Sequence, residues 1–291
     1  MRKKILAVCL MLVLAVCALA GCSGKKKVTA KSLLESVDKQ TKDMKSMESK
    51  MIMNMTMEGE DLEQLGGSMT ITMDVDVQTT TDPAATHMEG TMGMMGMNMD
   101  LQNYTVQEGD QICSYTNVMD QWIVQKMPFD KEAVKSLGVS AAELLDNSDS
   151  LTLAEETKDV EGVQAYIITG TIDGKSMQDL MQNASSSMGS VLGDAASMDL
   201  SGVTVDVEYA VSKEDEKPLY TNMVFHGMES AVPDVKMTFS DFSMNMKYIS
   251  FDTVDTITVP QEAIDKAQDI SSLTDSAASA DTAAEETETS K

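Results

Sequence analysis

Methionine is the residue type whose abundance and spacing could do chemistry in this chain. It occurs 27 times among 291 residues, against five phenylalanines and one tryptophan, and 14 of the methionines lie between Met44 and Met99. Thioethers are soft ligands that select Cu(I), but they are also flexible apolar groups that fill irregular spaces. His87, next to Met88, is a candidate for an additional copper ligand. The segment 92–99 has the spacing typical of methionine-rich copper motifs, and its candidate ligands are Met92, Met94, Met95, Met97 and Met99.

Residues for enzymatic chemistry are scarce. The chain has two histidines and contains no Gly-x-Ser-x-Gly elbow, HExxH motif or P-loop. With 47 acidic residues, some carboxylates must lie close together by chance, so we interpret Asp74 and Asp76 as the solvated face of a strand. We therefore expect no enzymatic activity and no cofactor. A net charge of -25 and a pI near 4.2 argue against nucleic-acid binding, which needs a basic surface.

The N-terminal residues have the order of a targeting signal. Basic residues at positions 2–4 precede the apolar run from Ile5 to Ala20, which is too short for a membrane span and suits a signal peptide. The run ends in Leu-Ala-Gly-Cys at positions 19–22, which resembles the lipobox of bacterial lipoproteins. The resemblance implies that residues 1–21 are removed and that Cys22 carries a diacylglyceryl group. The protein would then be held at the extracellular face of the cell membrane, since two acyl chains give stable attachment.

The rest of the chain divides into a tether, one domain and a tail. Residues 22–30 are the expected lipidated tether, and residues 271–291 form an acidic tail too poor in apolar side chains to order itself. The domain between them, 31–270, retains Cys113 as its single thiol, which excludes an internal disulfide and favours a buried, unreactive role. We expect a monomer.

Apolar spacing predicts the first elements of the domain. Spacings of three and four residues from Leu33 to Met47 predict a helix, with Thr29 or Ser32 as its cap. Strict alternation over 51–57 and 69–77 then predicts two strands of a hairpin. Alternation does not say which face of the sheet these side chains occupy. Within each strand it places the apolar side chains on one face, and the candidate ligand-lining residues are Met51, Met53, Met55, Met57, Met69, Ile71, Met73 and Val75.

Later segments alternate strands with short helices. Residues 86–102 read as one strand whose phase slips by one residue, which indicates a bulge or burial on both faces. Helices are predicted over 130–145 and 176–192, and a helical turn over 262–267. Further strands are predicted over 104–107, 111–116, 121–126, 150–156, 164–173, 203–212, 220–228, 236–242 and 243–248. This order predicts an α+β fold, a single large curved antiparallel sheet with helices on its concave side.

Several segments, in order along the domain, resemble a known superfamily. They are KSMESKMIMNMTMEGE, QICSYTNVMDQWIVQKM, VEGVQAYIITGTIDG, YAVSKEDEKPLYTNMVF and FDTVDTITVPQEAID. With the lipobox, they make the chain similar to Gram-positive lipoproteins of the superfamily of the LolA and LolB lipoprotein carriers and the LppX and LprG glycolipid carriers. The resemblance implies a half-barrel sheet over helices, with an apolar cavity that holds acyl chains. No ligand signature of single residues carries over.

Three interpretations of the methionines stay open. They could replace leucine and isoleucine in an ordinary core, form a pliable ligand-binding wall, or bind Cu(I). Our hypothesis is a membrane-anchored extracellular lipoprotein that binds a lipid or other apolar ligand in a methionine-lined cavity, and in its fuller form transports it. The alternatives are a copper-binding lipoprotein and a structural or interaction module of the cell envelope without a ligand.

Overall fold

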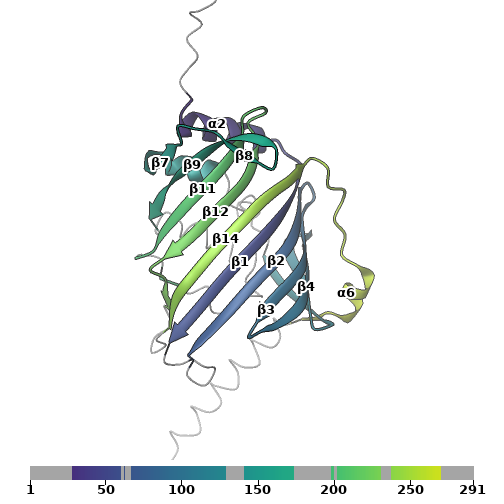
Figure 1. The fold of residues 1–291 in the computed structure, drawn as a ribbon. Coiled ribbons are helices and arrows are strands. Elements are labelled where there is room, and N and C mark those ends of the chain that lie inside the picture. The colour runs from purple at the N-terminus through teal and green to yellow at the C-terminus, as the bar shows by residue number, and fades with distance from the viewer. Residues whose placement is uncertain are drawn as a thin grey trace, which may run out of the picture.

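The computed structural model describes residues 28–59, 62, 67–128, 141–173, 198–199, 202–230 and 237–269. The predicted signal, Cys22 and the acidic tail lie outside these residues. The described strands form one curved sheet of 15 strands (Figure 1). The strands are β1 Ser46–Gly59, β2 Ser68–Thr81, β3 Ala84–Met94, β4 Met97–Glu108, β5 Gln111–Val118, β6 Gln121–Pro128, β7 Leu151–Leu153, β8 Lys158–Val160, β9 Val163–Asp173, β10 Met198–Asp199, β11 Thr204–Ser212, β12 Pro218–His226, β13 Glu229–Ser230, β14 Met237–Phe251 and β15 Gln268–Asp269.

Neighbouring strands of the sheet are antiparallel except at one edge, and its first and last long strands lie side by side. Its order is β15-β6-β5-β4-β3-β2-β1-β14-β12-β11-β9-β7, with β8 paired to β9, β13 to β14 and β10 to β13. Long strand β14 lies beside β1, so the last long strand of the domain pairs with the first. Only β15 runs parallel to its described neighbour, β6. The predicted large curved antiparallel sheet is confirmed.

The first helix, α2 (Ala30–Thr41), is shorter than its apolar spacing predicted. Thr29 caps it as one of the two predicted candidates, because its Oγ1 accepts a hydrogen bond from the backbone N–H of Ser32 at 3.1 Å. Met47, predicted to be helical, belongs to β1. The helical prediction fails there because Met47 is paired on both sides, with Thr79 of β2 and Phe251 of β14, and this pairing outweighs local spacing.

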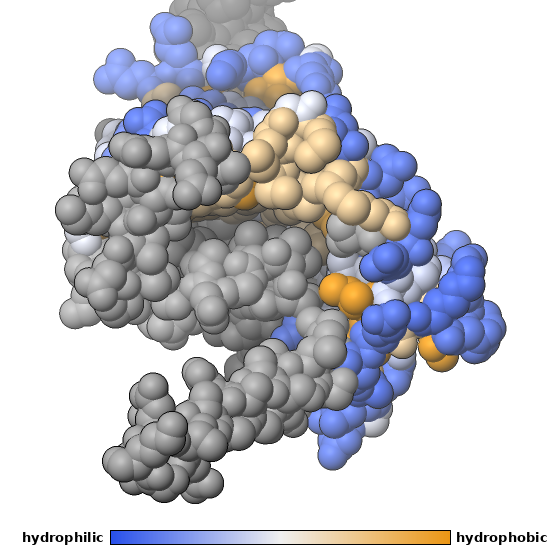
Figure 2. All heavy atoms as spheres, turned by 90° about the horizontal axis from the view of Figure 1, so that it is seen from below, coloured by the Kyte–Doolittle hydropathy of each residue, from blue (hydrophilic) through white to orange (hydrophobic). Residues whose placement is uncertain are grey.

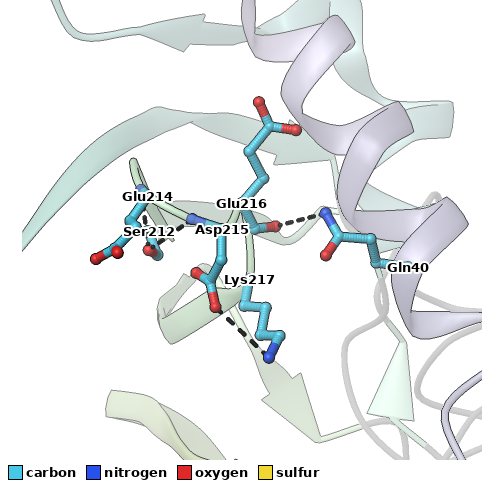
Figure 3. A network of polar contacts seen from close by, with 6 residues as sticks. All are labelled: Gln40, Ser212, Glu214, Asp215, Glu216 and Lys217. Atoms are coloured by element: carbon cyan, nitrogen blue, oxygen red, sulfur yellow. Dashed lines mark hydrogen bonds and ion pairs between the residues drawn. The ribbon is translucent and has the colours of Figure 1, made fainter.

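Helix α2 rests on the turn between β11 and β12 (Figure 3). Gln40 Nε2 donates to the backbone oxygen of Glu216 at 3.5 Å, and Ser36 Oγ donates to the carboxylate of Glu216. The turn is held by Ser212 Oγ, which accepts from the backbone N–H groups of Glu214 and Asp215 at 3.3 and 3.4 Å. These contacts fix one end of α2 to the sheet.

The described helices lie at the margins of the sheet (Figure 1). Helix α2 contacts α4 (Ala141–Asp146) and β7, and the helical turn η2 (Ser148–Ser150) lies close by. Helix α6 (Gln261–Lys266), predicted as a helical turn over 262–267, contacts β5 and β6. Residues 176–192 and most of 130–145, where helices were predicted, lie outside the described residues. The placement of helices on the concave side therefore stays a prediction.

Residues 86–102 form a tight hairpin, so the prediction of one bulged strand was wrong. Strand β3 ends at Met94 and β4 begins at Met97, directly opposite it. Met95 and Gly96 between them have φ values of 54° and 77°, the left-handed pair of a type I′ turn. Because the turn has two residues, inward-facing side chains occupy even positions in β3 and odd positions in β4. This change from even to odd positions is the phase slip in the sequence.

Other predicted strands merge or extend in the structure. The two strands predicted over 236–248 form the single strand β14, whose pairing with β1 shifts register between Thr56 and Met57 and between Glu48 and Ser49. The segment predicted over 104–107 is the second half of β4. Strands β8 and β15 were not predicted, because three-residue and two-residue strands carry too little periodicity.

Candidate functional site

All eight candidate lining residues lie on one face of the β1–β2 hairpin. They form four directly opposed pairs, which are Met51–Val75, Met53–Met73, Met55–Ile71 and Met57–Met69. Six of them are buried, and the remaining two, Met69 and Ile71, are half-buried and pack against the same core. That core also contains Leu33 and Val37 of α2 and Val207 of β11. We call the face that carries Met53 and Met73 the inner face, and the opposite face, which carries Asp74, the outer face.

A single row of methionines crosses the inner face. Six strands in succession, from β4 to β12, each contribute one residue to it, and each residue is directly opposite the next. The row runs Met99–Met92–Met73–Met53–Met244–Met223. Phe242 and Phe225 are paired in the adjacent row, with their rings stacked at 4.4 Å between centroids. The inner face is therefore a continuous surface of thioethers and aromatic rings.

Charged side chains are absent from the inner face of the described strands between β6 and β9 in the sheet order. In these strands the acidic and basic residues alternate outward, as Asp74 and Asp76 do in β2 and Asp206 and Glu208 do in β11. Lys50 on the outer face pairs with Asp74 at 2.6 Å. The prediction that Asp74 and Asp76 form a solvated face is confirmed, since both are exposed. Even the inner-face Tyr209 stays neutral, because burial raises its pKa well above its usual value.

A patch of uncharged polar side chains adjoins the methionines on the inner face of β3 to β6. Asn103 Nδ2 donates to Ser114 Oγ at 2.9 Å and to Thr116 Oγ1 at 2.8 Å, and all three side chains are buried. Thr86 Oγ1 and Gln125 Oε1, which lie on β3 and β6, are buried and have no hydrogen-bond partner among the described residues. The inner face thus offers an apolar region beside a neutral region that retains hydrogen-bonding capacity.

The outer face carries a pocket that the sequence did not suggest. Glu48, Gln78, His87 and Tyr104 stand opposite one another across β1 to β4. The segment 253–258 lies over them and encloses a pocket of about 390 Å³. His87 stacks on Tyr104 at 4.3 Å between centroids, and its partial burial lowers the pKa of its imidazole. The missed signal was the alternation of threonines with valine and isoleucine over 253–259.

Two sequence predictions about single residues are settled on this outer face. His87 was a candidate copper ligand, and this was wrong, because its side chain and those of the paired methionines of the β3–β4 hairpin occupy opposite faces. Cys113 is buried beneath α6 and accompanies Tyr115 and Trp122 in a small second core. The predicted burial is confirmed, and it raises the pKa of the thiol to about 11, which favours the unreactive protonated form.

The candidate copper ligands lie together at one end of the sheet. Met92 is opposite Met99 and Met94 is opposite Met97, whereas Met95 lies in the turn between the strands. Apolar side chains gather at this lower end of the molecule (Figure 2). Met95 and Met97 are among the most exposed of the described apolar residues, at 51% and 58%.

Comparisons with known proteins identify the chain's family. The model of a family of unknown function, DUF6612, matches residues 29–268. The chain belongs to the DUF6612 family. No curated protein matches this DUF6612 chain. Among the described residues of the DUF6612 domain, no helix is long and apolar enough to cross a bilayer.

Two solved structures are similar to the DUF6612 chain at low identity. LprF from Mycobacterium bovis is 12% identical, with a TM-score of 0.41, and the match covers 79% of this chain and 96% of LprF. A beta-barrel-like protein of the domain of unknown function DUF1849 from Brucella abortus is 10% identical, with a TM-score of 0.24, and the match covers 72% of this chain and 99% of that protein. At these values neither protein informs us about what the DUF6612 chain binds.

Proposed function

We propose that this DUF6612 protein is a non-enzymatic, membrane-anchored binding protein that takes a lipid or another apolar ligand on the inner face of its sheet. The observation that carries the proposal is the uncharged, methionine-rich inner face, with the row from Met99 to Met223 at its centre. Methionine side chains are more flexible than leucine, isoleucine or valine, and this suits a surface that must adapt to a ligand.

The physical chemistry of this face suits an acyl chain. Each methylene group moved from water to an apolar surface contributes about 0.8 kcal/mol, so a long chain binds well without specific polar contacts. Methionine is unbranched and flexible, and it adapts to ligands of different shape. A buried charge without a partner would be costly, and the inner face of the described strands offers no partner, so the bound part of the ligand is neutral.

The neutral polar patch on β3 to β6 supports an amphiphilic ligand. A lipid whose chain lies along the methionines could present hydroxyl or ester oxygens to this patch. Thr86 and Gln125 there have buried oxygens without partners in the described part of the chain. A hydrogen bond to a ligand would satisfy such atoms, and leaving them unsatisfied has a cost of roughly 1–3 kcal/mol each.

The proposal includes the location and the form of the protein. Cys22 carries the lipid anchor, and the domain stands outside the cell membrane as a monomer. The half-barrel of the LolA and LppX type, with helices over its concave face, would shield the bound ligand from water. In its fuller form, the proposal is that the protein also transfers the bound ligand to another carrier or to a membrane.

Neighbouring residues of β2 allow a matched test. Ile71 is half-buried on the inner face, whereas Thr72, the next residue, is exposed on the outer face. A fluorescent long-chain fatty acid would be titrated into the chain from Ser23 onward, and into its Ile71→Gln and Thr72→Gln variants. We expect saturable binding that Ile71→Gln weakens about tenfold and Thr72→Gln leaves unchanged, with circular dichroism showing that both variants are folded. Absence of saturable binding, or equal effects of the two substitutions, would contradict the proposal.

A further inference from the structure

The hairpin of β3 and β4 gathers methionines in a way that lipid binding does not require. Met94 and Met97 close the hairpin as a directly opposed pair, and Met92 and Met99 form the next pair on the same face. Side chains of directly opposed residues start about 4.5–5.5 Å apart at Cβ. Because methionine has three rotatable bonds, the four thioether sulfurs can converge on one point.

These side chains can be reached from water, unlike the methionines of β1. Met97 is 58% exposed, and Met92, Met94 and Met99 are half-buried. By contrast, the four methionines of β1 from Met51 to Met57 are each no more than 8% exposed. An ion can therefore enter at the hairpin without opening the core.

The ligand chemistry selects a soft monovalent cation. Thioethers favour Cu(I) over hard divalent ions, which need carboxylate or carbonyl oxygens. Within the described part of the chain, no group of three His, Cys, Asp or Glu side chains could hold a metal ion. Neutral ligands leave the ion with its positive charge, which a chain with a net charge of -25 tolerates well.

We propose that the β3–β4 hairpin binds one Cu(I) ion through the thioethers of Met92, Met94, Met97 and Met99. The site shares Met92 and Met99 with one end of the inner-face methionine row, but it lies at the tip of the sheet, and Cu(I) binding there does not require a bound lipid. His87 takes no part, since its side chain is on the outer face.

The hairpin of β5 and β6 provides an internal control. Its turn, Met119 and Asp120, has φ values of 52° and 62° and so the same left-handed conformation as Met95 and Gly96. Met119 is 66% exposed, but the pair that closes this hairpin is Val118 and Gln121, which has no sulfur. Both hairpins thus have an exposed methionine in the turn, but only the β3–β4 hairpin of the two has directly opposed methionine pairs.

The test is an anaerobic Cu(I) titration in competition with the chromogenic chelator bicinchoninate. The protein would be the chain from Ser23 onward with Cys113→Ser, so that no thiol remains to bind copper. We expect one Cu(I) per chain, and binding at least tenfold weaker in the M92L/M94L/M97L/M99L variant. Leucine conserves volume, and circular dichroism would verify the fold. The M94L/M97L variant, changed only at the tip, should weaken binding in the same direction.

Two single variants and one spectrum complete the design. Met95→Asn, which suits the turn better, and Met119→Leu should both leave Cu(I) affinity unchanged. With Ag(I) as a diamagnetic substitute, methionine methyl resonances in NMR spectra should shift at the four paired residues and not at Met119. The proposal is overturned if the chelator keeps all the copper, if the fourfold variant binds as well as the parent, or if Met119 responds as strongly as the pairs.

Discussion

Met53 lies directly opposite Met73 on the inner face, and the two side chains are only 6% and 2% exposed. The pair sits in the middle of the methionine row, between Met92 on one side and Met244 on the other. The most buried thioethers of the β1–β2 hairpin are therefore also part of the surface proposed to bind ligand. Stability and binding share these residues, and substitutions can separate the two roles.

Substitution of Met73 should distinguish packing from thioether chemistry. Met73→Ala leaves a cavity beside Met53 and should lower the free energy of unfolding by about 2–5 kcal/mol. Met73→Leu keeps the volume and should cost less than about 1.5 kcal/mol. Urea unfolding of both variants measures the difference. Equal losses for alanine and leucine would show that the site is not closely packed.

Gly90 is expected to be essential to the pairing of β2 and β3. A Cβ atom there would overlap the carbonyl oxygen of Asp74 and lie 2.7 Å from the Cα of Val75, and backbone atoms cannot move aside cheaply. Gly90→Ala should therefore lower the free energy of unfolding by about 3 kcal/mol or more. Gly93→Ala, whose Cβ would meet only the side chains of Thr72 and Asn98, should cost about 1 kcal/mol or less. Thermal and urea unfolding compare the two, and a smaller loss for Gly90→Ala than for Gly93→Ala would refute this reasoning.

Acid should weaken the domain through His87. Burial lowers the pKa of His87 in the folded state below its ordinary value of 6.5, and the carboxylate of Glu89 only partly offsets this. The folded protein then binds this proton less readily than the unfolded chain does, so stability is complete above pH 6.5 and falls as the pH drops through the folded-state pKa. Urea midpoints at pH 7.5 and 5.5 should differ more for the parent than for His87→Gln. In Glu89→Gln the loss should grow, and a smaller loss there would contradict the assigned cause.

Cys113 should resist thiol reagents while the protein is folded. Its side chain is 1% exposed, and the raised pKa, about 11, keeps it protonated at neutral pH. Reaction with a chromogenic disulfide at pH 8 should be at least a hundredfold slower in buffer than in strong denaturant. Stopped-flow absorbance measures both rates. Rapid labelling of the folded chain would mean that the core around Trp122 opens easily.

Periodicity was enough to predict the part of the fold that carries the candidate site. Alternation placed the methionines of 51–57 on one face of their strand and Met69 to Val75 on one face of theirs, and the structure pairs the two sets one by one. Such long amphipathic strands are specified residue by residue, because a slip of one position would expose every methionine. The same periodicity could not reveal that this face is the inner one, since that depends on contacts with β14 and β11.

Non-local contacts explain the errors. Met47 kept its helical spacing but pairs with strands that lie far along the chain, and His87 is close to the hairpin methionines in sequence yet on the other face. The outer pocket depends on a segment after residue 252 folding back over β1 to β4, and the alternation over 253–259 does not show that the segment returns to these strands. The row of six methionines is likewise assembled from six strands, which are spread over residues 53–244 of the sequence.

Native mass spectrometry of the chain from Ser23 onward, followed by organic extraction, tests the central claim most directly. The claim is that the methionine-lined inner face holds an apolar ligand. We predict a reproducible added mass that extracts into organic solvent as lipid, and that the Ile71→Gln variant retains less of it than Thr72→Gln. A clean mass for the bare polypeptide, with no uptake of added lipids, would contradict the claim and leave the inner-face methionines of β1 and β2 as packing residues.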